Sequence, residues 1–306
     1  MLVEVALLAV FLALGLALQR RDASDVLRER AWAAYWWTVT PTLVFTSFST
    51  VEVDRELGLA LAAAVLASWL VIALGYAYAQ AVARERDERG ALALGAGFPN
   101  TGFVGYPLAQ LALGNDGLAL MVLYDRLGWL VPSTAISTAI ARLHGRRDAA
   151  GRASARRRLR LVLVNPPLVA AVAAVALRAA GVDVAGAVEP LGRAASAVVG
   201  PAGFFLLGLV LPLEPPAHDL PELRKAGGVL AIRFGAAPLV LLGCGAALGT
   251  DLPAAFLLGA AMPCAFHLLV LARVFDVRPQ LVRLLVVGST VPAVVAVVAA
   301  SAFVGR

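Results

Sequence analysis

Apolar residues fill this chain in long runs that are separated by short charged segments. A helix that crosses a bilayer needs about 20 consecutive, mostly apolar residues. Runs of this kind occur in the first half of the sequence at residues 5–18, 32–51, 57–82, 91–113 and 118–141. In the second half they occur at residues 159–177, 191–213, 227–248, 253–275 and 281–304. The pattern predicts an all-α membrane protein with ten transmembrane helices.

The composition points in the same direction. Hydrophobic residues make up 60% of the 306 residues, charged residues make up 15%, and the mean hydropathy is +0.83. A soluble domain has about 25% charged residues, and a disordered chain has low hydrophobicity, so both classes are excluded. The two cysteines, Cys244 and Cys264, lie in apolar runs and have no metal-ligand spacing. We therefore expect neither a cofactor nor a metal, and no separate soluble domain.

Basic residues are distributed unevenly between the two sides of the predicted bundle. Most of the 26 Lys and Arg residues follow the odd-numbered apolar runs, and they are densest in the loop at residues 142–158. Cytoplasmic loops carry an excess of Lys and Arg, so this loop is predicted to be cytoplasmic and both termini extracytoplasmic. The net charge of +6 then marks topology in the plasma membrane (the cell inner membrane) and not a nucleic-acid partner.

Prolines within the apolar runs recur at a nearly constant offset between the two halves. Proline removes a helix hydrogen bond and clashes with the preceding turn, so matched prolines indicate matched breaks. The pairs are Pro41 with Pro201, Pro99 with Pro263, and Pro132 with Pro292. Because each repeat has an odd number of spans, residues 1–141 and 159–306 are predicted to form inverted five-helix repeats, as in alternating-access transporters.

Two apolar runs are interrupted at corresponding positions. Residues 95–107 contain four glycines and two prolines, and residues 259–267 contain Pro263 and the polar His267. Freed backbone groups at membrane depth require protein partners or a cavity. Half-helices that begin at such breaks direct N–H groups and a positive dipole end toward the centre, which suits an anionic ligand such as a carboxylate.

The motifs at these breaks resemble those of the auxin efflux carrier family, which includes plant auxin exporters and bacterial carriers of malonate and related acids. The resemblance is carried by residues 98–108 (FPNTGFVGYPL), 123–125 (LYD), 261–272 (AMPCAFHLLVLA) and 275–279 (FDVRP). It implies that helices four and nine are broken and cross near the bilayer midplane. It also implies scaffold helices at residues 1–51 and 159–213, often a homodimer surface, and a moving transport unit at residues 57–141 and 227–304.

The resemblance also implies a set of site residues. The predicted substrate-binding residues are Asn100, Thr101, Gly102, Cys264 and His267. The predicted backbone breaks are at Pro99, Pro107 and Pro263. Asp125 and Arg126 are ionisable residues inside a span and are candidates for coupling or gating. His267 stands where bacterial relatives commonly have Asn, so it adds a protonatable group to the site.

Each of these residues also has a structural explanation. Asn100 and Thr101 can cap freed backbone groups, and His267 can be a satisfied hydrogen-bonding group. Adjacent helical positions diverge by about 100°, so we expect Asp125 and Arg126 to have different partners. We expect Arg233 to snorkel toward the cytoplasmic interface. Trp32, Tyr35, Trp36 and Trp37 are interpreted as an interfacial aromatic belt.

The sequence as a whole predicts a transporter of small organic anions, such as malonate, malate or auxin-like acids, and not an enzyme. The partners are the anion and the lipid bilayer, and the sequence leaves proton or sodium coupling open. A sodium-coupled carrier of the bile-acid type shares this layout and is the alternative within transport. A receptor that binds without transporting is an alternative of another class. An intramembrane enzyme is disfavoured because the three histidines are scattered and no His-Glu-x-x-His motif occurs.

Overall fold

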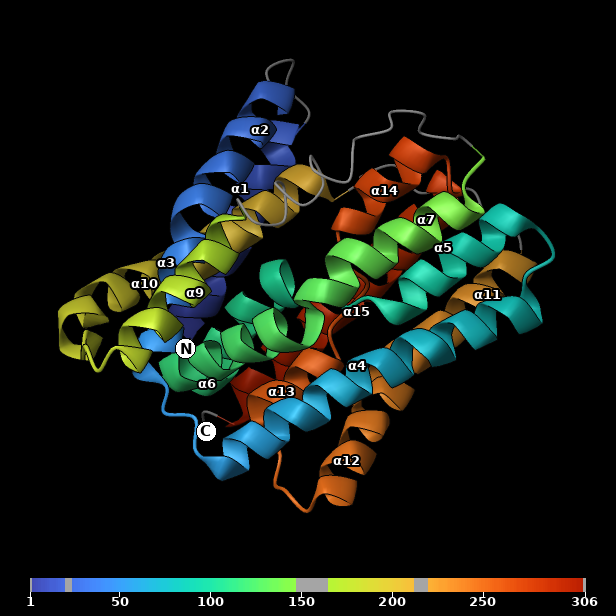
Figure 1. The fold of residues 1–306 in the computed structure, drawn as a ribbon. Helices are drawn as coiled ribbons and strands as arrows, with labels where there is room; N and C mark the ends of the chain where they lie inside the picture. The colour runs from blue at the N-terminus through green and yellow to red at the C-terminus, as the bar shows by residue number, and fades with distance from the viewer. Residues whose placement is uncertain (1, 20–23, 147–164, 212–219, 305–306) are drawn as a thin grey trace.

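The computed structural model describes residues 2–19, 24–146, 165–211 and 220–304, and these residues form helices without a β-strand (Figure 1). The helices of the first half are α1 (Leu2–Gln19), α2 (Ser24–Ala34), η1 (Tyr35–Val39), α3 (Thr40–Thr50), α4 (Arg55–Val82), α5 (Arg86–Gly97), η2 (Thr101–Gly105), α6 (Tyr106–Val131), η3 (Pro132–Ile136) and α7 (Ser137–His144). Those of the second half are α9 (Pro166–Ala179), α10 (Ala185–Val210), α11 (Leu220–Ala231), η4 (Ile232–Ala236), α12 (Ala237–Leu248), α13 (Ala254–Ala260), α14 (His267–Phe275) and α15 (Pro279–Val304).

Several of these helices are suited to a lipid environment. Within the described residues, four helical stretches are long and apolar enough to cross a membrane: 55–82, 185–210, 220–248 and 279–296. Their outer faces carry exposed apolar side chains, as α4 does at Leu66, Trp69 and Leu70. Surfaces of this kind are stable against lipid tails and costly in water.

The four η segments are π-helical turns, and three of them lie just before a proline. η1 precedes Pro41, η2 precedes Pro107, and η4 precedes Pro238. Proline has no N–H for the regular helix bond and clashes with the carbonyl one turn back, and a wider turn relieves that conflict. Within α6 the chain changes direction at Gly114, whose φ of 72° is accessible to glycine at little cost.

The helices fall into two groups. α1 packs along α10, and α3 packs along α9 and α10, so that these helices form a first group together with α2 and η1, at the left of Figure 1. α1 and α10 touch through their backbones, because a Cβ on Gly15 would lie 2.3 Å from the carbonyl oxygen of Phe205. Gly208 on α10 is equally close to α1, with Leu12 O 2.3 Å from such an added atom. Small residues allow helices in membranes to approach this closely.

The second group comprises the remaining helices and contains the broken segments. α4 packs against α5 and α12, α6 packs against α13, and α5 packs against α15. The two groups meet where α3 and α10 contact α6 and η2. There Gly203 of α10 faces Pro107, whose Cγ would lie 2.7 Å from a Cβ at position 203.

Candidate functional site

Both interrupted segments lie side by side at the centre of the second helix group. α5 ends at Gly97 and α13 at Ala260, and the chain resumes as a helix at Thr101 and at His267. Between these ends, Pro99 and Cys264 form an isolated antiparallel bridge. The N–H of Asn100 donates to Pro263 O at 2.7 Å, and the N–H of Ala265 donates to Phe98 O at 3.0 Å. The two breaks therefore satisfy part of each other's freed backbone groups, as buried polar groups require.

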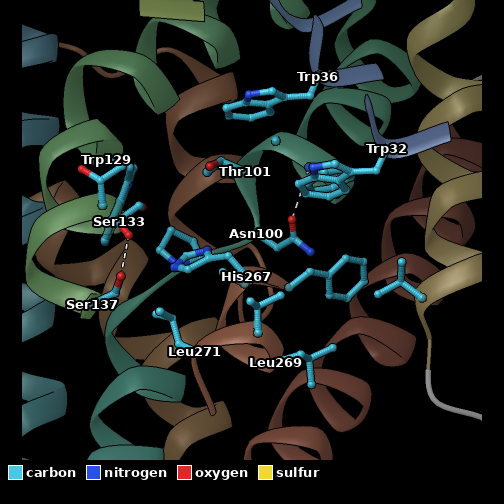
Figure 2. Close-up of a pocket in the computed structure, with 18 of the residues that line it drawn as sticks. Trp32, Trp36, Asn100, Thr101, Trp129, Ser133, Ser137, His267, Leu269 and Leu271 are labelled. Atoms are coloured by element: carbon cyan, nitrogen blue, oxygen red, sulfur yellow. Dashed lines mark hydrogen bonds between the residues drawn. The ribbon is translucent and has the colours of Figure 1, made fainter. Parts of the chain in front are cut away.

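Asn100 and His267 stand at the beginnings of the two helices that leave this crossing. Asn100 Oδ1 accepts a hydrogen bond from the N–H of Phe103 at 3.2 Å and so caps η2. The other end of this side chain, Nδ2, is buried and has no partner among the described residues. His267 is the first residue of α14, and its Nε2 is likewise buried without a partner among the described residues. Figure 2 shows both side chains beside one another in the same pocket.

The pocket is a cavity of about 1440 Å³ that spans the two helix groups. It is larger than the 300–1,000 Å³ typical of ligand pockets. Its lining includes residues of the crossing, namely Pro99, Asn100, Thr101, Gly102 and His267. Its other walls include residues of both groups, among them Gln19, Arg28, Trp32, Tyr35, Trp36, Asp125, Arg126, Trp129, Ser133, Ser137, Arg273 and Gln280.

Asp125 and Arg126 form one network on the wall of this cavity. Asp125 accepts hydrogen bonds from Thr101 Oγ1 and, at 2.6 Å, from Tyr106 Oη. The Arg126 guanidinium pairs with the same carboxylate and also donates to Tyr106 Oη at 3.2 Å. The expectation of separate partners is therefore wrong. The long arginine side chain folds back along the helix to its neighbour, which the angle between the two Cβ directions does not prevent.

An aromatic wall faces the crossing from α2 and η1. Trp32 stacks on Phe103 with a ring separation of 4.5 Å, and Trp36 stacks on Trp32 at 6.2 Å. Tyr35 is 3% exposed and donates its hydroxyl to Gly102 O at 3.3 Å. The interpretation of these three residues as an interfacial belt is wrong, whereas Trp37 is 60% exposed and fits a belt. The spacing of positions 32, 35 and 36 places them on one helix face, which is the signal that the sequence offered.

The comparison with protein families identifies a membrane protein. The model of a family described as membrane transport proteins matches residues 37–300 and so includes both breaks and the aromatic residues from Trp37 onward. The chain belongs to this family, the auxin efflux carriers. No curated protein sequence matches the chain. The protein is therefore a multi-pass membrane transporter.

One residue predicted to bind substrate, Cys264, and two predicted as backbone breaks, Pro107 and Pro263, contact other parts of the protein backbone. Cys264 is fully buried and is not among the residues that line the cavity. Its thiol donates to Gly95 O at 3.2 Å, and its N–H donates to Ser289 Oγ at 3.0 Å. Pro107 packs against Gly203, and Pro263 contributes its carbonyl to the crossing. Asn100, Thr101, Gly102 and His267 do line the cavity.

Arg233 of the transporter lies far from the position expected for it. A snorkelling arginine exposes its guanidinium at the interface, whereas Arg233 has an exposed fraction of 0%. It donates to three backbone carbonyls of α5 and of the α13 end, those of Ala96, Ala260 and Met262. The expectation of snorkelling is wrong because the breaks provide unpaired carbonyls inside the protein that can replace water as acceptors.

Ion pairs fix the beginning of α5 away from the cavity. The buried carboxylate of Glu88 accepts from Lys225 Nζ at 2.5 Å and from the N–H of Arg84 at 2.9 Å. Burial alone would raise the pKa of Glu88, but these hydrogen bonds outweigh it and hold that pKa below its ordinary value of 4.5. Nearby, burial lowers the pKa of His144, whose ring nitrogens contact Tyr76 Oη and Arg86 O. The first half-helix is thereby anchored at the end opposite its break.

The cavity is lined by polar and aromatic side chains. Within the described ranges, no group of three His, Cys, Asp or Glu side chains lies close enough to hold a metal ion. The lining residues include the polar side chains of Asn100 and His267, the Asp125–Arg126 pair and several aromatic rings. Such a set recognises and orients a solute.

Proposed function

We propose that this transporter carries small organic anions across the membrane by alternating access, with a carboxylate bound at the crossing. One observation carries the proposal: Asn100 and His267 line the same cavity, and the buried Nδ2 of the first and Nε2 of the second have no partner among the described residues. Buried donors without partners cost free energy unless a ligand accepts from them. A carboxylate accepts from both when the His267 ring carries its proton on Nε2.

The backbone adds to this preference for an anion. η2, which leads into α6, and α14 both begin at the crossing. Each helix N-terminus carries a partial positive charge of about half an elementary charge. The nearest carboxylate on this wall, Asp125, is already paired with Arg126, Thr101 and Tyr106, so it does not oppose a second anion with an unpaired charge.

The proposed mechanism moves one helix group relative to the other. The first group (1–51 and 159–213) serves as the scaffold, and the second (57–141 and 227–304) carries the crossing. In the proposed topology ten spans form two inverted repeats, with both termini outside the plasma membrane. The cavity reaches Gln19, Arg28, Arg273 and Gln280, next to the connections after the first and ninth spans. In the proposed topology these connections are cytoplasmic, which supports a cytoplasm-facing conformation.

The aromatic wall bears on which acid is carried. Trp32, Trp36 and Phe103 form a stacked apolar surface that lines the same cavity as Asn100 and His267. Aromatic surfaces bind apolar and aromatic bodies by stacking and burial. The arrangement favours a carboxylate attached to an apolar body, such as an indole-type acid, over a small dicarboxylate.

The test is flux into proteoliposomes that contain the purified full-length protein. Radiolabelled indole-3-acetate, malonate and malate are compared, each with and without proton and sodium gradients. Saturable uptake of at least one acid is expected, with Asn100→Ala reducing it. A sodium requirement would favour the bile-acid-type alternative, and ligand binding without uptake would favour a receptor. Uptake and binding that Asn100→Ala leaves unchanged would refute the site.

We also propose that the transporter forms a homodimer through the scaffold helices. α9 exposes Val169, Val172 and Val175, which lie along one face of the helix. A second copy can cover this apolar stripe. Cross-linking of single cysteines introduced on α9 in native membranes tests it, and monomer alone at every position would refute it.

A further inference from the structure

The crossing brings together the C-terminal ends of two helices as well as the beginnings of two others. α5 ends at Gly97 and α13 ends at Ala260. The last carbonyls of a helix have no partner within it, and they carry a partial negative charge of about half an elementary charge. Two such ends at one point therefore present about one full negative charge.

Arg233 is the group that meets these carbonyls. Its Nε donates to Met262 O at 3.1 Å, its Nη1 to Ala96 O at 3.3 Å, and its Nη2 to Ala260 O at 2.7 Å. One guanidinium thus bridges the ends of both half-helices, using donors that point in different directions from a planar fork.

The charge of Arg233 has no carboxylate partner in the described part of the chain. None of the ion pairs there involves it, although its side chain is fully buried. A buried charge is tolerated only when it is compensated and hydrogen-bonded. The two helix ends, with about one negative charge between them, supply that compensation.

We propose that Arg233 is the positioning residue of the crossing and that its cationic side chain holds the two half-helix ends together. The three carbonyls form a cation site, and this site accepts a free guanidinium ion when the Arg233 side chain is removed. Carbonyl oxygens at half-helix C-termini are ligands for cations in transporters with broken helices. Here the cation is covalently part of the protein and does not exchange.

The site acts on substrate only through the backbone. Arg233 does not line the cavity. It holds the carbonyls of Ala96 and Met262, and these residues lie shortly before Asn100 and His267 in the chain. Loss of the guanidinium separates the half-helix ends and displaces the two donors that face the cavity. This link to transport rests on the proposed function, whereas the binding of guanidinium does not.

The experiment compares the full-length protein with Arg233→Ala and Arg233→Met. Arg233→Ala leaves room for a free ion, and Arg233→Met fills much of the volume without charge or donors. The matched control is Arg178→Ala, since Arg178 is exposed and donates to Val51 O at 2.6 Å at the protein surface. Thermal unfolding of the purified proteins is followed in millimolar guanidinium chloride and in equal sodium chloride, and flux is measured in proteoliposomes.

Arg233→Ala is expected to unfold several degrees below the wild type. Millimolar guanidinium is expected to restore part of that shift saturably, and to restore part of an about tenfold or larger loss of flux. Wild type, Arg233→Met and Arg178→Ala should not respond. Recovery of folded Arg233→Ala only in the presence of guanidinium also supports the proposal.

Two results would overturn it. One is an Arg233→Met protein with the unfolding midpoint and flux of the wild type, which would show that volume alone is needed. The other is an Arg233→Ala protein whose midpoint guanidinium leaves unchanged. If the wild type transports no anion, the proposed function fails while the unfolding data still decide the role of Arg233.

Discussion

Replacing Asn100 by Asp separates the two roles of this side chain. Oδ1 accepts from the N–H of Phe103, and Nδ2 is free to donate to a substrate. Aspartate keeps an acceptor oxygen for the cap, and its negative charge is favourable at a helix N-terminus. It removes the N–H donor and places a like charge beside the bound carboxylate. Asn100→Asp is therefore expected to fold normally and to bind the anion poorly.

The size of the loss follows from the missing contact. A hydrogen bond to a charged group contributes about 1.5–3 kcal/mol, which is about a ten- to hundredfold change in the dissociation constant. Repulsion between the two carboxylates adds to this loss. Asn100→Ala loses the cap too, and so about 1 kcal/mol of stability in addition to the affinity.

The assay measures initial flux against substrate concentration, together with the unfolding midpoint of each purified variant. Asn115→Asp is the control, because it adds the same charge at an exposed position of α6. Wild-type affinity in Asn100→Asp would refute the assignment of Nδ2 as a substrate donor. A midpoint of Asn100→Asp as low as that of Asn100→Ala would refute the assignment of the cap.

Three further changes test other parts of the structure. Gly208→Ala places a methyl group against the backbone of α1 and should lower the free energy of unfolding by about 1–3 kcal/mol. Gly186→Ala is the control, because the space around Gly186 is open and no loss is expected. Equal unfolding midpoints for the two variants would contradict the close packing of α1 and α10. Because the folded pKa of Glu88 lies below 4.5, its stabilisation is present above 4.5 and is lost as the pH falls toward the folded value. Glu88→Gln should flatten the plot of unfolding midpoint against pH in this range. An unchanged plot would contradict the stabilising role of the Glu88 carboxylate. Trp32→Ala should raise KM for indole-3-acetate more than for malonate. Trp37→Ala, at an exposed position, should change neither KM. A parallel change in KM for both acids would refute stacking of the substrate on Trp32.

The helices and the breaks could be predicted from the sequence because their signals are local. Runs of apolar residues predict most of the helices, although α2 (Ser24–Ala34) lies largely in a charged segment between two runs. Glycine with proline marks the positions near Pro99 and Pro263 where regular hydrogen bonding fails. The prediction that the two breaks lie next to each other rested on a resemblance. The hydrogen bond from the N–H of Asn100 to Pro263 O shows how they meet. The inverted relation of the two halves stays a prediction.

Side-chain partners were harder to predict because they depend on which elements meet. Arg233 was predicted to lie at the interface because its distance from the beginning of the apolar run was the only information available. Its acceptors come from other segments of the chain, and the sequence does not show that these segments meet it. Arg126 was judged from the angle between neighbouring Cβ atoms, which ignores the length of the side chain. Tyr35 carries both an aromatic ring and a hydroxyl, and only the structure shows that the hydroxyl meets Gly102.

The crossing is tied by main-chain groups, and this bears on how such a carrier can evolve. The bonds from Asn100 N to Pro263 O and from Ala265 N to Phe98 O do not depend on the identity of the side chains at those positions. Substitutions that reshape the pocket can accumulate while these main-chain hydrogen bonds between the two breaks are preserved. One inherited framework can in this way be retuned from one cargo to another by changing a handful of side chains around it.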